Sequence, residues 1–77
     1  MTHPPLNDFP VGAKVRLVSI DGDHQLMRRL ISLGLPLGSE VEVLHHRSRG
    51  VVVAKQGNRI ALGSGIAECL HAEPVGP

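Results

Sequence analysis

The chain has 77 residues, with eight basic and seven acidic side chains and a formal net charge of +1 at neutral pH. This length allows one domain, and the near balance of charge disfavours nucleic acid as the main partner, because such proteins usually carry a strong basic excess. Phe9 is the only Phe, Tyr or Trp, and Cys69 is the only cysteine. The sequence therefore excludes an internal disulfide and a paired-cysteine zinc site. We expect a single domain over residues 1–77, with a core of Val, Leu, Ile and Ala.

The start of the chain shows no export signal. Residues 1–5 contain neither the basic segment nor the apolar segment of a signal peptide. No apolar run approaches the roughly 20 residues that cross a bilayer. The sequence therefore predicts a cytoplasmic protein without direct membrane insertion.

The first predicted elements are a lead-in and a strand. Residues 1–8 are rich in proline, and we expect them to be flexible, with Leu6 and Phe9 as candidates for packing against the domain. Lys14–Ile20 is rich in β-branched and aliphatic residues, which predicts a strand. Its alternation breaks after Leu17, which predicts a bulge.

A helix is predicted next, over residues 24–33. Asp23 suits its N-cap, because a carboxylate there accepts from free backbone N–H groups, and Gly34 suits the left-handed position that ends a helix. The apolar residues fall on one face of the helix: Leu26, Met27, Leu30, Ile31 and Leu33. One helix on a small domain rarely buries two adjacent rows of side chains. We therefore expect some of Met27, Ile31 or Leu35 to be exposed.

The rest of the chain predicts four more short strands, at residues 40–44, 51–54, 59–62 and 69–73. They are separated by a polar turn at His45–Gly50, a hairpin turn at Gly57-Asn58, and one helical turn over residues 64–68 with Ser64 as its N-cap. Residues 74–77 are expected to be a flexible tail. The valine-rich run 51–53 is expected near a sheet edge, which predicts weak homo-oligomers. The predicted fold is mainly β with one helix: a small five-stranded SH3-like barrel, with the helix between the first two strands.

One run carries a family resemblance. Residues 28–38 read RRLISLGLPLG, which resembles the RRLxxLGLxPG pattern of the FeoA family of ferrous-iron transport accessory proteins, with Leu37 departing from the proline-glycine step. Gly12-Ala13-Lys14-Val15 and Asp21-Gly22-Asp23 precede the run at the expected spacing, and Ile60-Ala61-Leu62 and Ala67-Glu68-Cys69-Leu70 follow it. The resemblance covers about residues 8–73. The basic turn His45–Gly50 and Cys69 depart from the family.

The resemblance implies an SH3-like fold, no catalytic activity and no cofactor. It also implies a partner in bacterial iron uptake, the membrane GTP-binding ferrous-iron permease FeoB, contacted from the cytoplasmic side of the inner membrane. The segment with the densest resemblance combines arginines with apolar side chains, a mixture that protein interfaces favour. We therefore expect the partner-binding residues to be Arg28, Arg29, Leu35, Pro36, Leu37 and Gly38.

Two other functions stay open on the sequence. Arg28, Arg29, Arg47 and Arg49 are candidates for phosphate contacts in a basic-patch nucleic-acid-binding barrel, although the aromatic side chains on which bases stack are missing. The regulatory SH3-like module of a metal-dependent repressor system is the second alternative.

Neither a metal site nor a catalytic site is expected. His71 and Cys69 are weak metal-ligand candidates that would share one strand face, but a metal site usually needs three or four ligands. No serine lies in a nucleophile motif.

Overall fold

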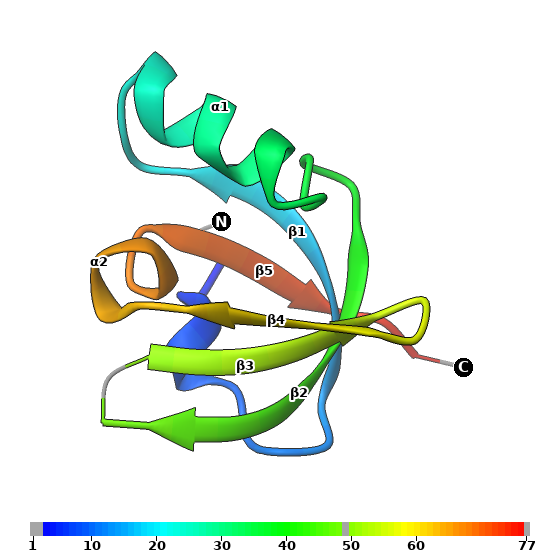
Figure 1. Ribbon diagram of the computed structural model, residues 1–77. Helices are drawn as coiled ribbons and strands as arrows, with labels where there is room; N and C mark the ends of the chain where they lie inside the picture. Colours follow the sequence, from blue (N-terminus) through cyan, green and yellow to red (C-terminus); the bar gives the residue numbers. More distant parts are fainter. Residues whose placement is uncertain (1–2, 49, 77) are drawn as a thin grey trace.

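The computed structural model describes residues 3–48 and 50–76, which form one antiparallel five-stranded sheet with a helix outside it (Figure 1). The strands run in the order β4-β3-β2-β1-β5, with bounds β1 Lys14–Ile20, β2 Glu40–Arg47, β3 Gly50–Lys55, β4 Asn58–Leu62 and β5 Leu70–Pro74. The helix α1, His24–Ser32, lies between β1 and β2 in the chain. The predicted fold class is therefore confirmed, although β2 runs on through three residues that we assigned to a polar turn.

The core is aliphatic, as the composition predicts. Alternate residues of the strands point inward, for example Val15 and Leu17 in β1 and Val41 and Val43 in β2, which is the two-residue period of a half-buried strand. The predicted bulge in β1 is present, because the register against β5 shifts between Leu17 and Ser19. It lets β1 change direction within one strand.

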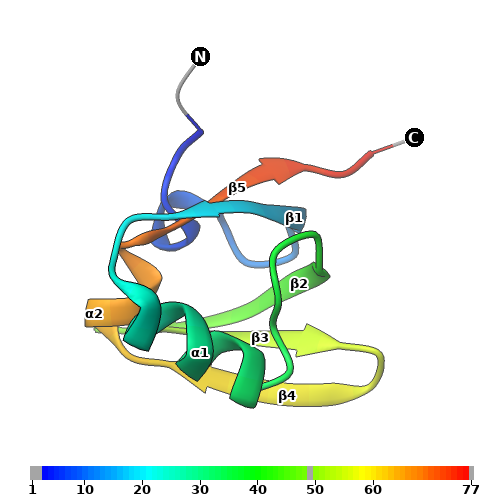
Figure 2. The ribbon, with the colours of Figure 1, turned by 90° about the horizontal axis from the view of Figure 1, so that it is seen from above.

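The helix α1 begins and ends where local signals predict. Asp23 is its N-cap, and its Oδ1 accepts a hydrogen bond from the Leu26 N–H at 3.1 Å. Gly34 has φ +85°, the left-handed conformation that glycine adopts without strain. Leu30 is the one buried residue of the helix. Figure 1 shows α1 outside the strands, and Figure 2 shows, from above, that it lies over the β4 side of the sheet.

The lead-in packs against β5 and, as expected, buries Leu6 and Phe9 in the core. Leu6 is fully buried in a short 3-10 helix, η1 Leu6–Asp8. The Ala72 N–H donates to the Pro4 carbonyl at 3.1 Å, and Pro5 forms a β-bridge with His71. At the other end of the chain, Val75 N–H donates to the Lys14 carbonyl at 2.8 Å.

Three details of the second half of the chain differ from expectation. The β3–β4 turn is Gln56-Gly57, with φ +49° and +86°, rather than Gly57-Asn58, because these two residues adopt a type I′ turn. The short helix α2, Ser64–Ala67, is capped by Gly63 rather than Ser64. The run 51–53 lies in β3, which has a neighbour on both sides, so it is not at an edge.

Candidate docking surface

The connection between α1 and β2, residues 33–39, is held to the rest of the fold at both ends. Leu30 and Leu35 are 2% and 0% exposed, and the Leu35 N–H donates back to the Leu30 carbonyl at 2.8 Å. Further on, Leu17 of β1 exchanges two bonds with the end of the connection: Gly38 N–H to Leu17 O at 2.7 Å, and Leu17 N–H to Ser39 O at 2.9 Å. Hydrogen bonds therefore tie this connection to α1 at one end and to β1 at the other.

A tight turn shapes the tip of the connection. Ser39 N–H donates to the Pro36 carbonyl at 3.1 Å, and the Ser39 hydroxyl donates to the same oxygen at 2.6 Å. Gly38 has φ +93°, while Leu37 has no positive φ, so residues 36–39 form a type II turn. The turn holds the Leu37 side chain outward, 41% exposed.

Lys55, a residue to which we gave no role, joins this connection to the end of β3. Its ammonium donates to the Gly34 carbonyl at 2.6 Å and to the Ser39 hydroxyl oxygen at 3.2 Å. A cation beside the last carbonyls of a helix is favourable. The sequence carries no signal for this contact, since one partner is a backbone carbonyl 21 residues away.

The predicted partner-binding residues do not all reach the surface. Arg28, Arg29, Pro36 and Gly38 are exposed. Leu35 is fully buried, so its assignment as a contact residue is wrong: the chain turns inward after Gly34 and places this leucine in the core. In its place the structure exposes three apolar side chains of the helix and its cap: Met27 at 38%, Ile31 at 57% and Leu33 at 37%.

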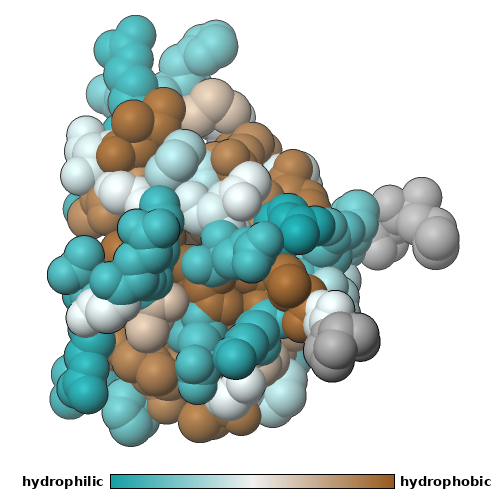
Figure 3. All heavy atoms as spheres, turned by 90° about the vertical axis from the view of Figure 1, so that its right-hand side faces the viewer, coloured by the Kyte–Doolittle hydropathy of each residue, from teal (hydrophilic) through white to brown (hydrophobic). Residues whose placement is uncertain are grey.

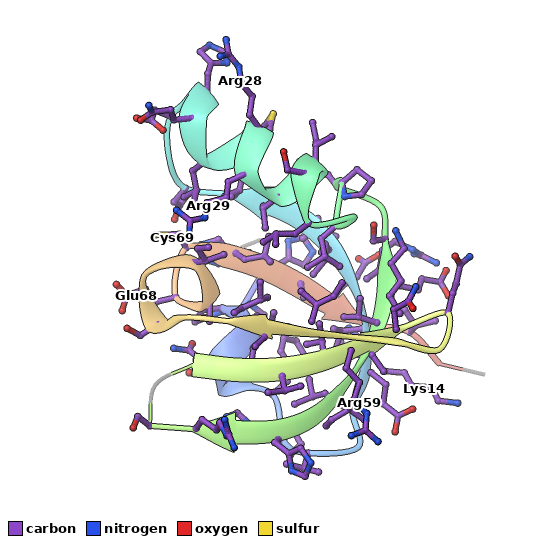
Figure 4. The ribbon with its side chains drawn as sticks, viewed as in Figure 1. Lys14, Arg28, Arg29, Arg59, Glu68 and Cys69 are labelled. Carbon is purple, nitrogen blue, oxygen red and sulfur yellow. The ribbon has the colours of Figure 1, made fainter. Side chains whose placement is uncertain are left out.

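The two arginines lie on different sides of α1. Figure 4 shows Arg28 pointing away from the sheet, whereas Arg29 points back toward Cys69. Arg29 lines a shallow hollow with Asp23, Gln25 and Leu26.

Met27 and Ile31, four residues apart, share one flank of the helix beside Arg28. Figure 3 shows apolar side chains reaching the surface next to polar ones at the top of the molecule, where α1 lies. We call Met27, Arg28, Ile31 and Leu37 the helix surface.

The two weak metal-ligand candidates are not placed as a metal pair. Cys69 precedes β5, so it does not share a strand face with His71. The Nε2 of His71 lies 2.8 Å from Asp21 Oδ2, and its Nδ1 lies 2.9 Å from the His3 carbonyl oxygen. The hydrogen bond with Asp21 raises the pKa of His71, against the opposing effect of partial burial. Within residues 3–48 and 50–76, no three His, Cys, Asp or Glu side chains are grouped to hold an ion.

The basic turn is only partly a turn. His45, His46 and Arg47 belong to β2, while Arg49 lies outside the described residues. His46 Nε2 lies 2.7 Å from the Phe9 carbonyl oxygen. Arg47 borders a hollow of about 410 Å³ over the ends of β3 and β4, away from the helix surface. Of the helices in the described part of the chain, none is long and apolar enough to cross a membrane.

Known proteins match this chain over nearly its whole length. The FeoA domain family model matches residues 5–74. A protein of Methanocaldococcus jannaschii named Fe(2+) transport protein A is 33% identical over 69 residues, which is 90% of this chain and 84% of that protein. A crystal structure described as an iron uptake regulatory protein (FeoA) superimposes with a TM-score of 0.83 and 30% identity, covering 92% of this chain and 96% of that one.

A further match is to part of a larger protein. A manganese-dependent transcriptional repressor, in complex with manganese, superimposes with a TM-score of 0.86 and 26% identity. The match covers 95% of this chain but 37% of the repressor. The fold is therefore shared with one part of that protein.

Proposed function

Because this chain belongs to the FeoA domain family, we propose that it is a non-catalytic, cytoplasmic accessory protein of ferrous-iron uptake. It acts by contact with the cytoplasmic side of the membrane GTP-binding ferrous-iron permease FeoB. The partner meets the helix surface, and the protein reaches the membrane through that partner.

The observation that carries this proposal is the exposure of apolar side chains on a fixed backbone. Ile31 is 57% exposed and Leu37 is 41% exposed, and Figure 4 shows Arg28 pointing outward from α1. Apolar side chains with an arginine are typical of protein interfaces. The backbone bonds around Gly38 and the contacts of Lys55 hold this surface in place, so little conformational freedom is lost on binding.

The second candidate is a regulatory module in a metal-dependent repressor system. The likeness to the manganese-dependent repressor favours it. The near-complete coverage of the FeoA structure, set against 37% of the repressor, favours the transport role.

The test is capture of the permease from membranes by Ile31→Ser and Arg28→Glu, together with ferrous-iron uptake in cells. Both residues are exposed, and surface substitutions usually change stability by no more than about 0.5 kcal/mol. We expect several-fold weaker capture and reduced uptake, with an unchanged melting temperature. Leu35→Ser is unsuitable, because it places a hydroxyl in the core.

Matched controls separate docking from general surface effects. Val11→Ser removes an apolar side chain that is 59% exposed, close to the 57% of Ile31. Arg59→Glu reverses the same charge as Arg28→Glu at a site far from α1 (Figure 4). Both controls should capture the permease like the parent. Normal capture by both test variants would show that the helix surface is not the docking site, and would direct attention to the basic turn His45–Gly50.

A further inference from the structure

The two edges of the sheet are protected to different degrees. The outer edge of β5 is covered by the lead-in, through the Ala72 N–H to Pro4 O bond and the bridge between Pro5 and His71. At the other end of the sheet, β4 pairs with β3 alone. Among residues 3–48 and 50–76, no backbone group makes a hydrogen bond to the outer edge of β4. An open edge is a template for pairing with another strand.

The turn geometry fixes which groups of β4 point outward. In a two-residue hairpin the closing pair, here Lys55 and Asn58, is hydrogen bonded. Bonded and non-bonded pairs then alternate along an antiparallel ladder, so Ile60 and Leu62 bond inward to β3. The N–H and C=O groups of Arg59 and Ala61 therefore point away from β3. Both residues are exposed.

We propose that β4 pairs with β4 of a second copy of this chain, antiparallel and about a two-fold axis at Ile60. In this register Arg59 lies opposite the partner's Ala61, and Ala61 lies opposite the partner's Arg59. Each of these two pairs exchanges both of its backbone hydrogen bonds. The outer edge of β4 can pair with an identical edge, because Arg59 and Ala61, whose backbone groups point outward, lie on either side of Ile60.

The side chains fit the same register. Ile60, which is partly buried, meets the partner's Ile60 as a non-bonded pair, with Cα atoms about 4.5 Å apart. Beside it runs a groove of about 390 Å³ bordered by Leu33, Lys55, Gln56, Asn58 and Ile60, which a second β4 would partly cover. Arginine faces alanine, so no like charges lie directly opposite, although the two Arg59 side chains are diagonal neighbours.

The proposed contact is weak by construction. The strand has five residues, and interfaces well below about 1,200 Å² belong to transient encounters. The diagonal arginines repel each other, and salt screens that repulsion. The dimer therefore forms at high protein concentration and tightens with salt.

The first test is sedimentation velocity of the parent and of Ala61→Pro over a concentration series. Proline removes the outward N–H of residue 61, which β3 does not use, and proline is tolerated on edge strands. We expect the dissociation constant to rise at least tenfold. In the parent, the amide protons of Arg59 and Ala61 should become protected from hydrogen exchange as concentration rises.

Val11→Pro is the matched control. Ala13 N–H donates to the Pro10 carbonyl at 3.1 Å and Gly12 has φ +94°, so Val11 is the second residue of a type II turn, a position that favours proline. This variant should associate like the parent. Equal weakening by both proline variants would count against the β4 edge, as would an Ala61→Pro variant that associates normally.

A charge swap tests the register if Ala61→Pro fails to fold. Arg59→Glu should associate weakly with itself, because two glutamates then lie diagonally. The mixed dimer of Arg59→Glu with the parent should be tighter than either homodimer, because it places one glutamate diagonal to one arginine. A parent that stays monomeric at millimolar concentration and high salt overturns the proposal. So does association that Ile31→Ser abolishes and the charge swap leaves unchanged, since it would place the contact on α1.

Discussion

At the scale of single residues, His71 of β5 contacts both the lead-in and the turn before α1, and these contacts favour its protonated form. Its Nδ1 faces the carbonyl oxygen of His3, and its Nε2 faces the carboxylate of Asp21. Both partners only accept hydrogen bonds, and only the imidazolium has an N–H on each ring nitrogen. The contact with Asp21 raises the pKa of His71, and when the ring is protonated it donates both to the lead-in and to the turn before α1.

This arrangement predicts a pH-dependent cost for Asp21→Asn. A pKa raised by folding stabilises the protein fully below the unfolded value of about 6.5, and that stabilisation is lost as the pH rises through the folded value. Near pH 5.5 the free energy of unfolding should be higher for the parent than for Asp21→Asn. The difference should be about 0.5 kcal/mol or less, because Asp21 is 78% exposed. The difference should shrink near pH 8.5 in urea unfolding.

Two controls identify the titrating group. In a His71→Gln background the effect of Asp21→Asn should no longer change with pH. His3 also lies near a carboxylate, with its Nε2 3.7 Å from Glu73 Oε1, so the measurement is repeated with His3→Gln. A difference that grows toward high pH would contradict the assignment.

At the scale of elements, the turn after α1 holds a residue that its geometry does not favour. Leu37 is the second residue of the type II turn at 36–39, where proline is preferred because its ring fixes φ near −65°. No bond from the Leu37 N–H is found in the described part of the chain. Leu37→Pro should therefore raise the free energy of unfolding by about 0.4–1 kcal/mol, by restricting the unfolded chain. Chemical denaturation measures this, and Leu37→Ala controls for loss of the side chain.

Elements with local signals could be predicted, and those that depend on distant contacts could not. The Asp23 cap, the Gly34 stop and the bulge after Leu17 follow from residues close in sequence, and all three are present. The burial of Leu35 is set by the path of the chain after the helix, where helical periodicity no longer applies. The role of Lys55 depends on a carbonyl from another element. The packing of Leu6 is expected from its apolar side chain, but the bridge from Pro5 to His71 depends on β5, at the far end of the chain.

At the scale of the whole molecule, strand order decides which segments are available for contact. We expected the valine-rich run 51–53 near an edge because a small five-stranded barrel leaves short strand edges. The sheet instead places it inside and puts β4 at the edge. Hydrophobicity does not separate these arrangements, since a strand inside the sheet and a strand at its edge can both bury alternate side chains such as Val51 and Val53. The same topology leaves α1 attached through Leu30 and its outer flank open to a partner.

The last prediction concerns metal and the fold as a whole. The core is a continuous hydrophobic cluster, aliphatic except for Phe9, and His71, the better placed of the two ligand candidates, has both ring nitrogens engaged. We therefore expect folding without metal and no micromolar binding of ferrous iron in anaerobic calorimetry. Thermal unfolding is an independent check, because a ligand at 100 times its dissociation constant would add about 2.7 kcal/mol of stability, whereas we expect chelator and ferrous iron to leave the melting temperature unchanged. Tight 1:1 binding that is lost in a His71→Gln, Cys69→Ser double variant would instead mean that the imidazole leaves Asp21 to bind the ion, and that the link between β5 and the lead-in opens when iron is present.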